Sequence, residues 1–326
     1  MRESLQERCD LFIENRGELK LVFPFVSSVI TPLCSSLFTL KGLCVDATTI
    51  QNCRKVLKEN TGLFSNFRGI SEAVVISLLA LSDNPEEKMH RMIEVHARLR
   101  DGVWPSEFLV IAAIVIADLG QPETYEEVVE RTKAIYRKMK EAHPFLTTSE
   151  DMAFAALLAL SDMDAFSIEE ETERCYSILM PEFFSKNAVQ SLSHVLALGE
   201  QPAEEKCERV MALFRYLKER GLKYGTNYEL ATLGVLALQE VGFEALAQDM
   251  IAVDEFLRTQ KGFGPFSITA KQRLMYAGIL TMYDYTPKFD TMQAAMLNGV
   301  VALIIAQQAA MCAAMAASVA ASNANH

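Results

Sequence analysis

Two kinds of apolar pattern alternate along this chain. The segments SEAVVISLLALSD (71–83) and SEDMAFAALLALSD (149–162) would be apolar on nearly every side of a helix. The segments EEKMHRMIEVHARLR (86–100) and EEKCERVMALFRYLKER (204–220) place apolar residues three and four positions apart, so only one helix face is apolar. A buried helix followed by a half-exposed one predicts a helical hairpin, which cannot cover its apolar faces without neighbouring hairpins.

The hairpin pattern recurs about every forty residues. The hexapeptide LLALSD occurs at 78–83 and again at 157–162, and related segments place seven anchor residues at spacings of 41, 37, 42, 38, 40 and 44. The anchors are Thr39, Ala80, Ala117, Ala159, Ala197, Ala237 and Thr281. The residue three positions before most anchors is Gly, Ala or Ser, and a stripe of small residues lets neighbouring helices approach closely. The spacing predicts an all-α array of about seven helical hairpins over residues 1–290, curved into an α/α superhelix or a partly closed toroid.

The C-terminal segment has a different composition. Residues 291–326 contain no Asp, Glu, Lys or Arg, and 13 of these 36 residues are Ala. Larger apolar residues recur there at helical spacing, which predicts a long apolar C-terminal helix of about 28 residues and ~42 Å. Three placements stay open: along the concave face of the array, against a second copy in a homo-oligomer, or in contact with a membrane. Asn298, Gln307 and Gln308 count against the membrane.

Charge and cysteine pattern narrow the partners and the compartment. The formal net charge is −11, and no run of Lys or Arg is longer than two residues. A nucleic-acid partner is therefore not expected, because its phosphates would be repelled. The seven cysteines show no C-x-x-C spacing, and the charged segment 1–20 lacks the apolar core of a signal peptide. These features predict a cytoplasmic protein without a disulfide framework.

Aromatic residues in the loops are the main binding candidates. Loops that lead into the mostly apolar segments carry an aromatic residue beside Gly or Pro, as in TGLFSNFRG (61–69), DGVWPSE (101–107) and QKGFGPFS (260–267). Stacked hairpins would bring these loops to one rim, able to hold a peptide, a protein segment or an apolar ligand. Alternatively, each ring wedges its own turn and covers the next helix. The candidates are Phe64, Phe67, Arg68, Trp104, Tyr224, Phe263 and Phe266.

His194 is a further candidate, because it occupies a position that is small in most units. It is either a buried base or ligand, or a core histidine bonded to a backbone carbonyl. The chain contains no H-E-x-x-H, G-x-S-x-G, P-loop or dinucleotide-binding glycine pattern. We therefore predict no catalytic residue, no metal site and no cofactor.

Two resemblances add to this interpretation. The loop KGFGPFS and the hairpin rhythm resemble α/α-toroid enzymes such as protein prenyltransferases and terpene cyclases. That resemblance implies a zinc held by Asp, Cys and His or a cluster of aspartates, and the chain has neither pattern. Nearly the whole chain resembles an uncharacterised bacterial family catalogued as domain of unknown function four-thousand-and-three. The resemblance rests on LFIENRGELK (11–20), LKENTGLFSNFRG (57–69), LLALSDNPEE (78–87) and the charge-free tail. It implies a cytosolic protein of helical hairpins and no known activity.

Regular hairpins without a catalytic constellation indicate a non-catalytic binding or scaffolding module with a protein or peptide partner. One alternative is an α/α-toroid enzyme or binding protein with an enclosed apolar pocket. It requires the first and last hairpins to touch and acidic or His side chains to point inward. A second alternative is a peripheral membrane protein held by residues 291–326.

Overall fold

The computed structural model of the protein describes residues 1–26, 30–69, 72–239, 241–264 and 267–285. Within these ranges the chain forms 14 α-helices and two short 3₁₀ helices, and no strand. The predicted all-helical class is therefore confirmed. The predicted C-terminal helix at 291–326 and the candidate Phe266 lie outside the described residues. Among the described helices, none is both long and apolar enough to cross a membrane.

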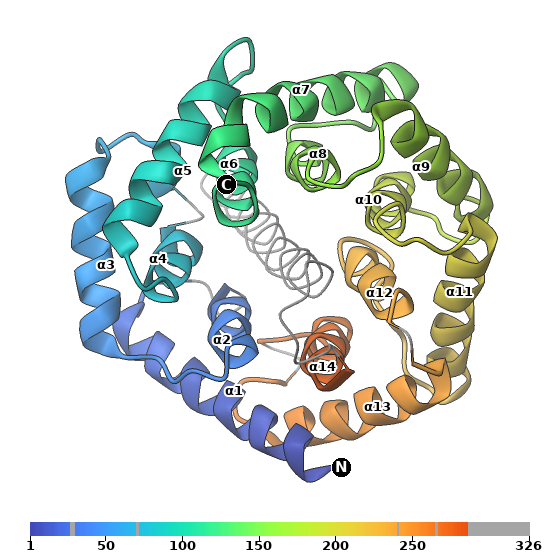
Figure 1. Cartoon of the computed structure of the whole chain (residues 1–326). Coiled ribbons are helices and arrows are strands. Elements are labelled where there is room, and N and C mark those ends of the chain that lie inside the picture. Colours follow the sequence, from blue (N-terminus) through green and yellow to red (C-terminus); the bar gives the residue numbers. More distant parts are fainter. Residues whose placement is uncertain (27–29, 70–71, 240, 265–266, 286–326) are drawn as a thin grey trace, which may run out of the picture.

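The described helices form two concentric rings (Figure 1). The outer ring contains α1 (Glu3–Val22), α3 (Ala47–Asn60), α5 (Pro85–Arg100), α7 (Tyr125–Ala142), α9 (Ala165–Leu179), α11 (Ala203–Glu219) and α13 (Phe243–Thr259). The inner ring contains α2 (Ile30–Leu40), α4 (Glu72–Ala80), α6 (Glu107–Leu119), α8 (Asp151–Ala159), α10 (Lys186–Leu196), α12 (Leu230–Ala237) and α14 (Ala270–Tyr285). The 3₁₀ helix η1 (Asn66–Arg68) contacts both α4 and α6, and η2 (Pro122–Thr124) leads into α7.

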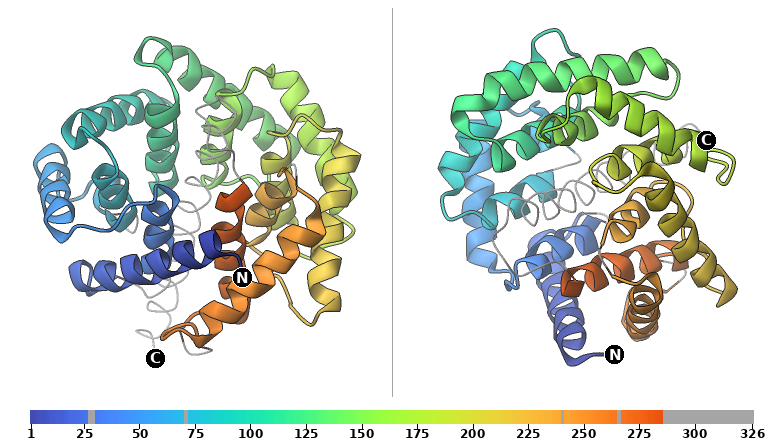
Figure 2. Two further views of the ribbon diagram at one scale, coloured as in Figure 1. Left: turned by 60° about the horizontal axis from the view of Figure 1, so that its bottom comes forward. Right: turned by 45° about the vertical axis from the view of Figure 1, so that its right-hand side comes forward.

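Side-chain patterning explains which helix lies in which ring. In α6 every residue from Leu109 to Ala117 is buried, so this helix has no face for solvent. In α5 only one stripe is buried, including Met89, Met92 and Leu99, while Glu94 stays exposed. The mostly apolar segments therefore form the inner ring, and the segments with one apolar face form the outer ring, as Figure 2 shows from two further sides.

The small residues of the sequence pattern lie where inner helices touch. Each inner helix has one anchor residue near its C-terminal end, and for α10 this residue, Ala197, directly follows the helix. A Cβ on Gly234 of α12 would approach Cδ1 of Leu192 in α10 to 2.7 Å. A Cβ on Gly278 of α14 would approach Cδ1 of Leu236 in α12 to 2.8 Å. Both distances are shorter than carbon atoms tolerate, so a Cβ at either position would force the neighbouring leucine side chain to shift.

The ring closes where the two ends of the described chain meet. Helix α1 packs against α13 and α14, and α14 packs against α2 (Figure 1). Arg2 forms ion pairs with Asp249 at 2.6 Å and with Asp284 at 3.4 Å. The Phe12 ring lies among the closing helices, with ring centroids 6.1 Å from Phe263 and 6.2 Å from Tyr276. Closure therefore combines surface ion pairs with a buried aromatic cluster.

We call the contact between α1 and the pair α13–α14 the seam. Arg16 lies buried at its centre. The side chain of Arg16 is nearly inaccessible, and its guanidinium donates to the Lys261 carbonyl at 2.8 Å and the Gly262 carbonyl at 3.4 Å. The same guanidinium lies 4.6 Å from the centre of the Phe263 ring. Gly262 has a φ of +88°, and a Cβ there would collide with the Arg16 guanidinium, so both glycine's freedom and its small size are needed.

We expect Arg16→Ala to lower the free energy of unfolding by about 2–4 kcal/mol, because it removes charged hydrogen bonds and a cation–π contact from a buried site. Urea denaturation measures the change. Arg215→Ala is the matched control, since the Arg215 side chain is 61% exposed and its nearest carboxylate is 3.8 Å away. The control should change stability by less than about 0.5 kcal/mol. Equal effects of the two substitutions would refute the importance of this seam.

Candidate functional site

Five successive loops each expose one aromatic side chain. Every one of these loops joins an outer helix to the next inner helix. Such loops contact the start of the neighbouring inner helix, as Gly69 does with Glu107 of α6 and as the loop before α6 does with Met152 of α8, so the loops lie at the same end of the ring. The five exposed residues are Phe25, Phe64, Trp104, Phe145 and Phe184, each at least 91% exposed. We call this set the aromatic rim. Exposed aromatic rings are costly in water, and their gathering at one end of a protein is typical of an interaction surface.

The structure separates the predicted loop residues into two groups. Phe64 and Trp104 belong to the aromatic rim, and Arg68 is half-buried beside it in sequence. Phe67, Tyr224 and Phe263 are buried and cannot belong to an exposed rim. Their burial fits the alternative in which each ring wedges its own turn. Phe67, for example, packs edge-on against the His96 ring, with centroids 5.1 Å apart.

A groove runs beside Trp104. Its volume is about 520 Å³, and it lies between the loop after α5, helix α7 and the start of α8. Trp104, Tyr136 and Met152 supply apolar surface, and Arg137 supplies an exposed guanidinium. The Nε of Arg137 donates to the Lys133 carbonyl at 3.3 Å. The volume is within the range of about 300–1,000 Å³ that is usual for ligand sites.

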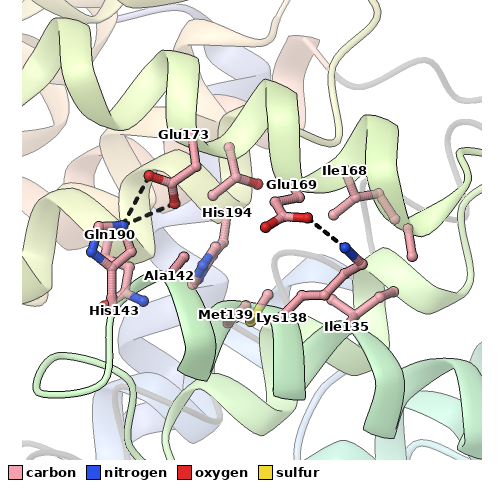
Figure 3. Close-up of a pocket in the computed structure, with 12 residues that line it drawn as sticks. Ile135, Lys138, Met139, Ala142, His143, Ile168, Glu169, Glu173, Gln190 and His194 are labelled. Carbon is pink, nitrogen blue, oxygen red and sulfur yellow. Dashed lines mark hydrogen bonds and ion pairs between the residues drawn. The ribbon is translucent and has the colours of Figure 1, made fainter.

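A second, smaller cavity lies in the wall of the ring, between α7, α9 and α10 (Figure 3). Its free volume is about 20 Å³, enough for about one water molecule. Three buried polar atoms that line it have no hydrogen-bond partner among the described residues: Oγ1 of Thr172, Oε1 of Gln190 and Nδ1 of His194. Buried polar atoms without partners are rare in folded proteins, so this polar cavity is suited to a small hydrogen-bonding molecule.

One ion pair, from α7, and one histidine–carboxylate hydrogen bond, from the residue after α7, reach α9 around the polar cavity (Figure 3). Nζ of Lys138 lies 2.6 Å from Oε2 of Glu169, and Nε2 of His143 lies 2.8 Å from Oε1 of Glu173. These side chains are more exposed than His194, which is only 1% exposed. The polar cavity thus has a charged outer part and an uncharged interior.

Burial shifts the titration of two groups behind the cavity. Burial lowers the pKa of His194 to about 3, so the imidazole is neutral at pH 7. Burial raises the pKa of Asp151 to about 7, against the opposing effect of the Thr148 N–H that donates to its carboxylate at 2.8 Å. Oδ1 of Asp151 lies 3.6 Å from Nδ1 of His194, too far for a hydrogen bond.

The sequence pointed to His194 but not to its surroundings. Gln190 lies one helical turn before His194 on the same face of α10, and its Nε2 donates to Oγ1 of Thr147 at 2.9 Å. The spacing of these two polar side chains, four residues apart, was the available signal. Asp151 and Thr172 come from other helices, and no local pattern connects them to His194. Among the described residues, no group of three or more His, Cys, Asp or Glu side chains could hold a metal ion.

The fold and the sites define the class of this protein as an all-helical ring with an aromatic rim and a small polar cavity in its wall. The chain belongs to the family described as Protein of unknown function (DUF4003), whose model matches residues 16–309. This confirms the resemblance seen in the sequence. The chain is also 24% identical over 319 residues to "Uncharacterized protein YeaA" from Bacillus subtilis (strain 168), which covers 95% of this chain and 94% of the relative. No solved structure matches the chain.

Asp151 predicts a specific pH dependence. Because its folded-state pKa is raised to about 7, the folded protein keeps a proton that the unfolded chain releases near its ordinary pKa of about 4. Stability therefore falls as pH rises from about 4 to about 7. Asp151→Asn, which cannot ionise but can still accept from Thr148, should gain about 2–4 kcal/mol on the wild type between pH 4 and pH 8.

The measurement is urea denaturation at a series of pH values. The lowered pKa of His194 acts in the opposite direction, since it removes stability as pH falls from about 6.5 to about 3. His194 is 3.6 Å from position 151, so the two proteins are compared above about pH 6.5, where the imidazole is neutral in both the folded and the unfolded state, as well as below it. Asp162→Asn, at an exposed site, is the control. Parallel stability curves for the wild type and Asp151→Asn would show that the Asp151 carboxyl ionises normally.

Proposed function

We propose that this protein is a cytoplasmic, non-catalytic binding module, and that its aromatic rim takes up a segment of a partner protein. The observation that carries the proposal is the exposure of one aromatic ring on each of five successive loops. Each loop also has residues that turn inward and fix it. In the loop before α10, Phe184 is exposed while its neighbour Phe183 is buried against Phe214, with ring centroids 5.2 Å apart.

Rigid loops favour binding, because little conformational freedom is lost when a partner docks. The loop before α8 is held by hydrogen bonds instead of by a buried ring. Nζ of Lys140 donates to the carbonyls of Pro144 and Thr147, both at 2.6 Å, while Phe145 between them is 99% exposed. The exposed rings are therefore presented from a fixed backbone.

The groove beside Trp104 is the proposed centre of the rim. Trp, Tyr and Arg are the residues that most often dominate binding energy at protein interfaces, and here Trp104, Tyr136 and Arg137 line one groove. The groove suits a partner segment with a large apolar side chain and a carboxylate. The apolar side chain would pack on Trp104, and the carboxylate would pair with the exposed Arg137 guanidinium.

We further infer that the seven pairs of outer and inner helices are copies of one structural unit. The inference is supported by an anchor residue near or just after the C-terminal end of each inner helix and by the regular spacing of about forty residues. A unit that repeats around a ring also repeats its loops at one end, which accounts for the recurrence of exposed aromatic residues.

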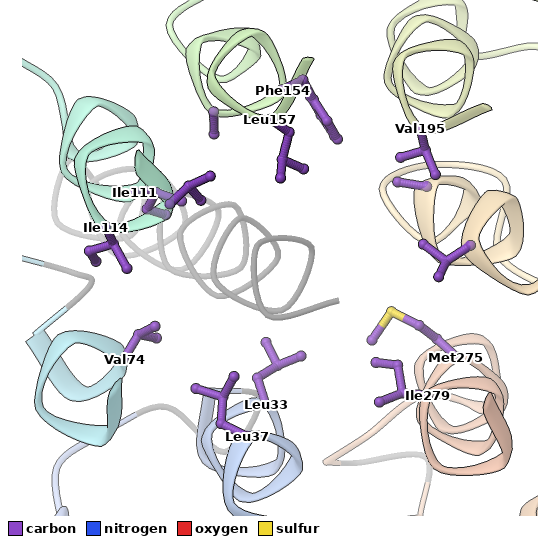
Figure 4. Close-up of a cluster of buried hydrophobic side chains, with 14 of the residues drawn as sticks. Leu33, Leu37, Val74, Ile111, Ile114, Phe154, Leu157, Val195, Met275 and Ile279 are labelled. Atoms are coloured by element: carbon purple, nitrogen blue, oxygen red, sulfur yellow. The ribbon is translucent and has the colours of Figure 1, made fainter. Parts of the chain in front are cut away.

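The alternative, an enzyme with an enclosed pocket, requires contact between the first and last hairpins and acidic or His side chains that point inward. The first and last described helices do touch, as a toroid requires. The side chains that Figure 4 labels around the ring centre form a hydrophobic cluster. The aromatic rim therefore remains the better basis for a function.

Trp104 is the single tryptophan of the chain, so its fluorescence reports on the rim directly. Peptides selected from a random display library on the wild-type protein should shift its emission to shorter wavelength on titration, because indole leaves water. Replacing Phe64, Phe145 and Phe184 by Ser should weaken binding at least about tenfold while Trp104 remains as the probe, since each anchor contributes about 1 kcal/mol or more.

Phe166→Ser is the matched control. Phe166 is 68% exposed, but it lies in the first turn of α9, after a loop that joins an inner helix to an outer one. It is therefore at the opposite end of the ring, and its substitution should leave peptide affinity unchanged. Failure to select any peptide that needs the rim residues, with circular dichroism unchanged, would refute the proposal.

A further inference from the structure

Three residues that line the polar cavity each have a buried polar atom that needs a partner (Figure 3). Oγ1 of Thr172, Oε1 of Gln190 and Nδ1 of His194 make no hydrogen bond with another described residue, although these residues are only 5%, 1% and 1% exposed. The outer helices α7 and α9 cover α10 on the side that faces away from the ring centre (Figure 1). Every residue that lines the cavity is described, so the cavity belongs to the wall of the ring.

The amide group of Gln190 has a defined orientation. Oγ1 of Thr147 donates its only proton to the Met139 carbonyl at 2.9 Å, so toward Gln190 this hydroxyl can only accept. The atom of Gln190 that faces Thr147, at 2.9 Å, must therefore be the amide nitrogen Nε2. This leaves Oε1 as a buried acceptor, and a buried acceptor without a donor is destabilising. A donor inside the cavity would satisfy it.

Thr172 differs from the matching threonine of the preceding outer helix. Thr132 and Thr172 are each the eighth residue of their helices, α7 and α9, and both are buried. Oγ1 of Thr132 donates to the Val128 carbonyl, one turn earlier, at 2.7 Å. Oγ1 of Thr172 makes no such bond with the carbonyl of Ile168, which has the corresponding position in α9. The Thr172 hydroxyl thus keeps its proton for a molecule in the cavity.

Size and charge determine which molecule suits the cavity. Its free volume of about 20 Å³ accommodates about one water molecule. Burial lowers the pKa of His194 to about 3, so the imidazole is neutral at pH 7, and Nδ1 can either donate or accept. Of the two carboxylates at the cavity, Glu169 pairs with Lys138. The other, Glu173, is hydrogen-bonded to His143. An ion would lose its hydration there without gaining an unpaired opposite charge, so a neutral molecule is favoured.

We propose that one resident water molecule occupies the polar cavity and joins α9 to α10. It accepts the proton of the Thr172 hydroxyl, donates a proton to Oε1 of Gln190 and forms a third hydrogen bond with Nδ1 of His194. Three hydrogen bonds are typical of a buried water molecule, and cavities that stay dry are apolar, unlike this one. The water is then a structural part of the wall. This proposal does not depend on the proposed function, because the aromatic rim takes no part in it.

The sign of one substitution tests the proposal in the full-length protein. Thr172→Val keeps the shape of the side chain and removes its hydroxyl. With the water in place a hydrogen bond is lost, so we expect the unfolding equilibrium constant, measured by urea denaturation, to rise about two- to tenfold. Without the water, the substitution removes a buried hydroxyl that has no partner, and the constant should fall.

Thr132→Val is the matched control, because it removes a hydroxyl whose partner is known. It should raise the unfolding constant by a similar factor. A fall for Thr172→Val alongside a rise for Thr132→Val would overturn the proposal.

A rise for Thr172→Val would also result if the Thr172 hydroxyl turned back to the Ile168 carbonyl. A high-resolution crystal structure of the full-length protein separates the two cases. We expect one spherical peak of electron density within about 2.6–3.2 Å of Thr172 Oγ1, Gln190 Oε1 and His194 Nδ1. A Thr172 hydroxyl bonded to Ile168, with no peak in the cavity, would overturn the proposal. Density too large for one water molecule would overturn it in favour of a larger ligand.

Discussion

The structure depends on closure of the ring between α1 and the pair α13–α14. An inner helix such as α6 is apolar on all sides, and it is stable only when neighbours cover both flanks. In an open array the two terminal inner helices would each expose one flank. When the ring closes, α2 and α14 pack against each other, so neither helix has an exposed flank. Contacts between residues about 245 to 280 positions apart thus complete a core that is otherwise built from near neighbours.

The chemistry of the seam fits this task. The buried guanidinium of Arg16 satisfies carbonyl groups of the turn after α13 and stacks on Phe263, so the turn is held from α1. Arg is suited to such a site, because its planar group can donate and stack at the same time. The ion pairs of Arg2 lie nearer the solvent and contribute less, since water and salt screen them. The buried contacts of Arg16 therefore hold the seam together more than the ion pairs of Arg2 do.

The polar cavity in the wall stands against this apolar background. A core selected only for stability would not place Gln190 and His194 beside each other in an inner helix and leave one polar atom of each without a partner. Burial keeps the imidazole neutral, so it can donate or accept a hydrogen bond without carrying charge. The cavity and the aromatic rim are separate features: one is small and enclosed, and the other is open and repeated.

The sequence by itself determined the helices, the ring to which each belongs and the family. The spacing of apolar residues, compared with the helical period of about 3.6, shows how much of a helix surface is covered by neighbours. For this reason the burial of Leu109–Ala117, and of Met89, Met92 and Leu99, could be predicted. It did not determine which loop aromatic is buried. Phe183 and Phe184 are identical neighbours, and only packing against Phe214 assigns one to the core and leaves the other on the rim. Closure of the ring and the meeting of Asp151, Thr172 and His194 were likewise decided by tertiary structure, because contacts between different helices leave no periodic trace in the sequence.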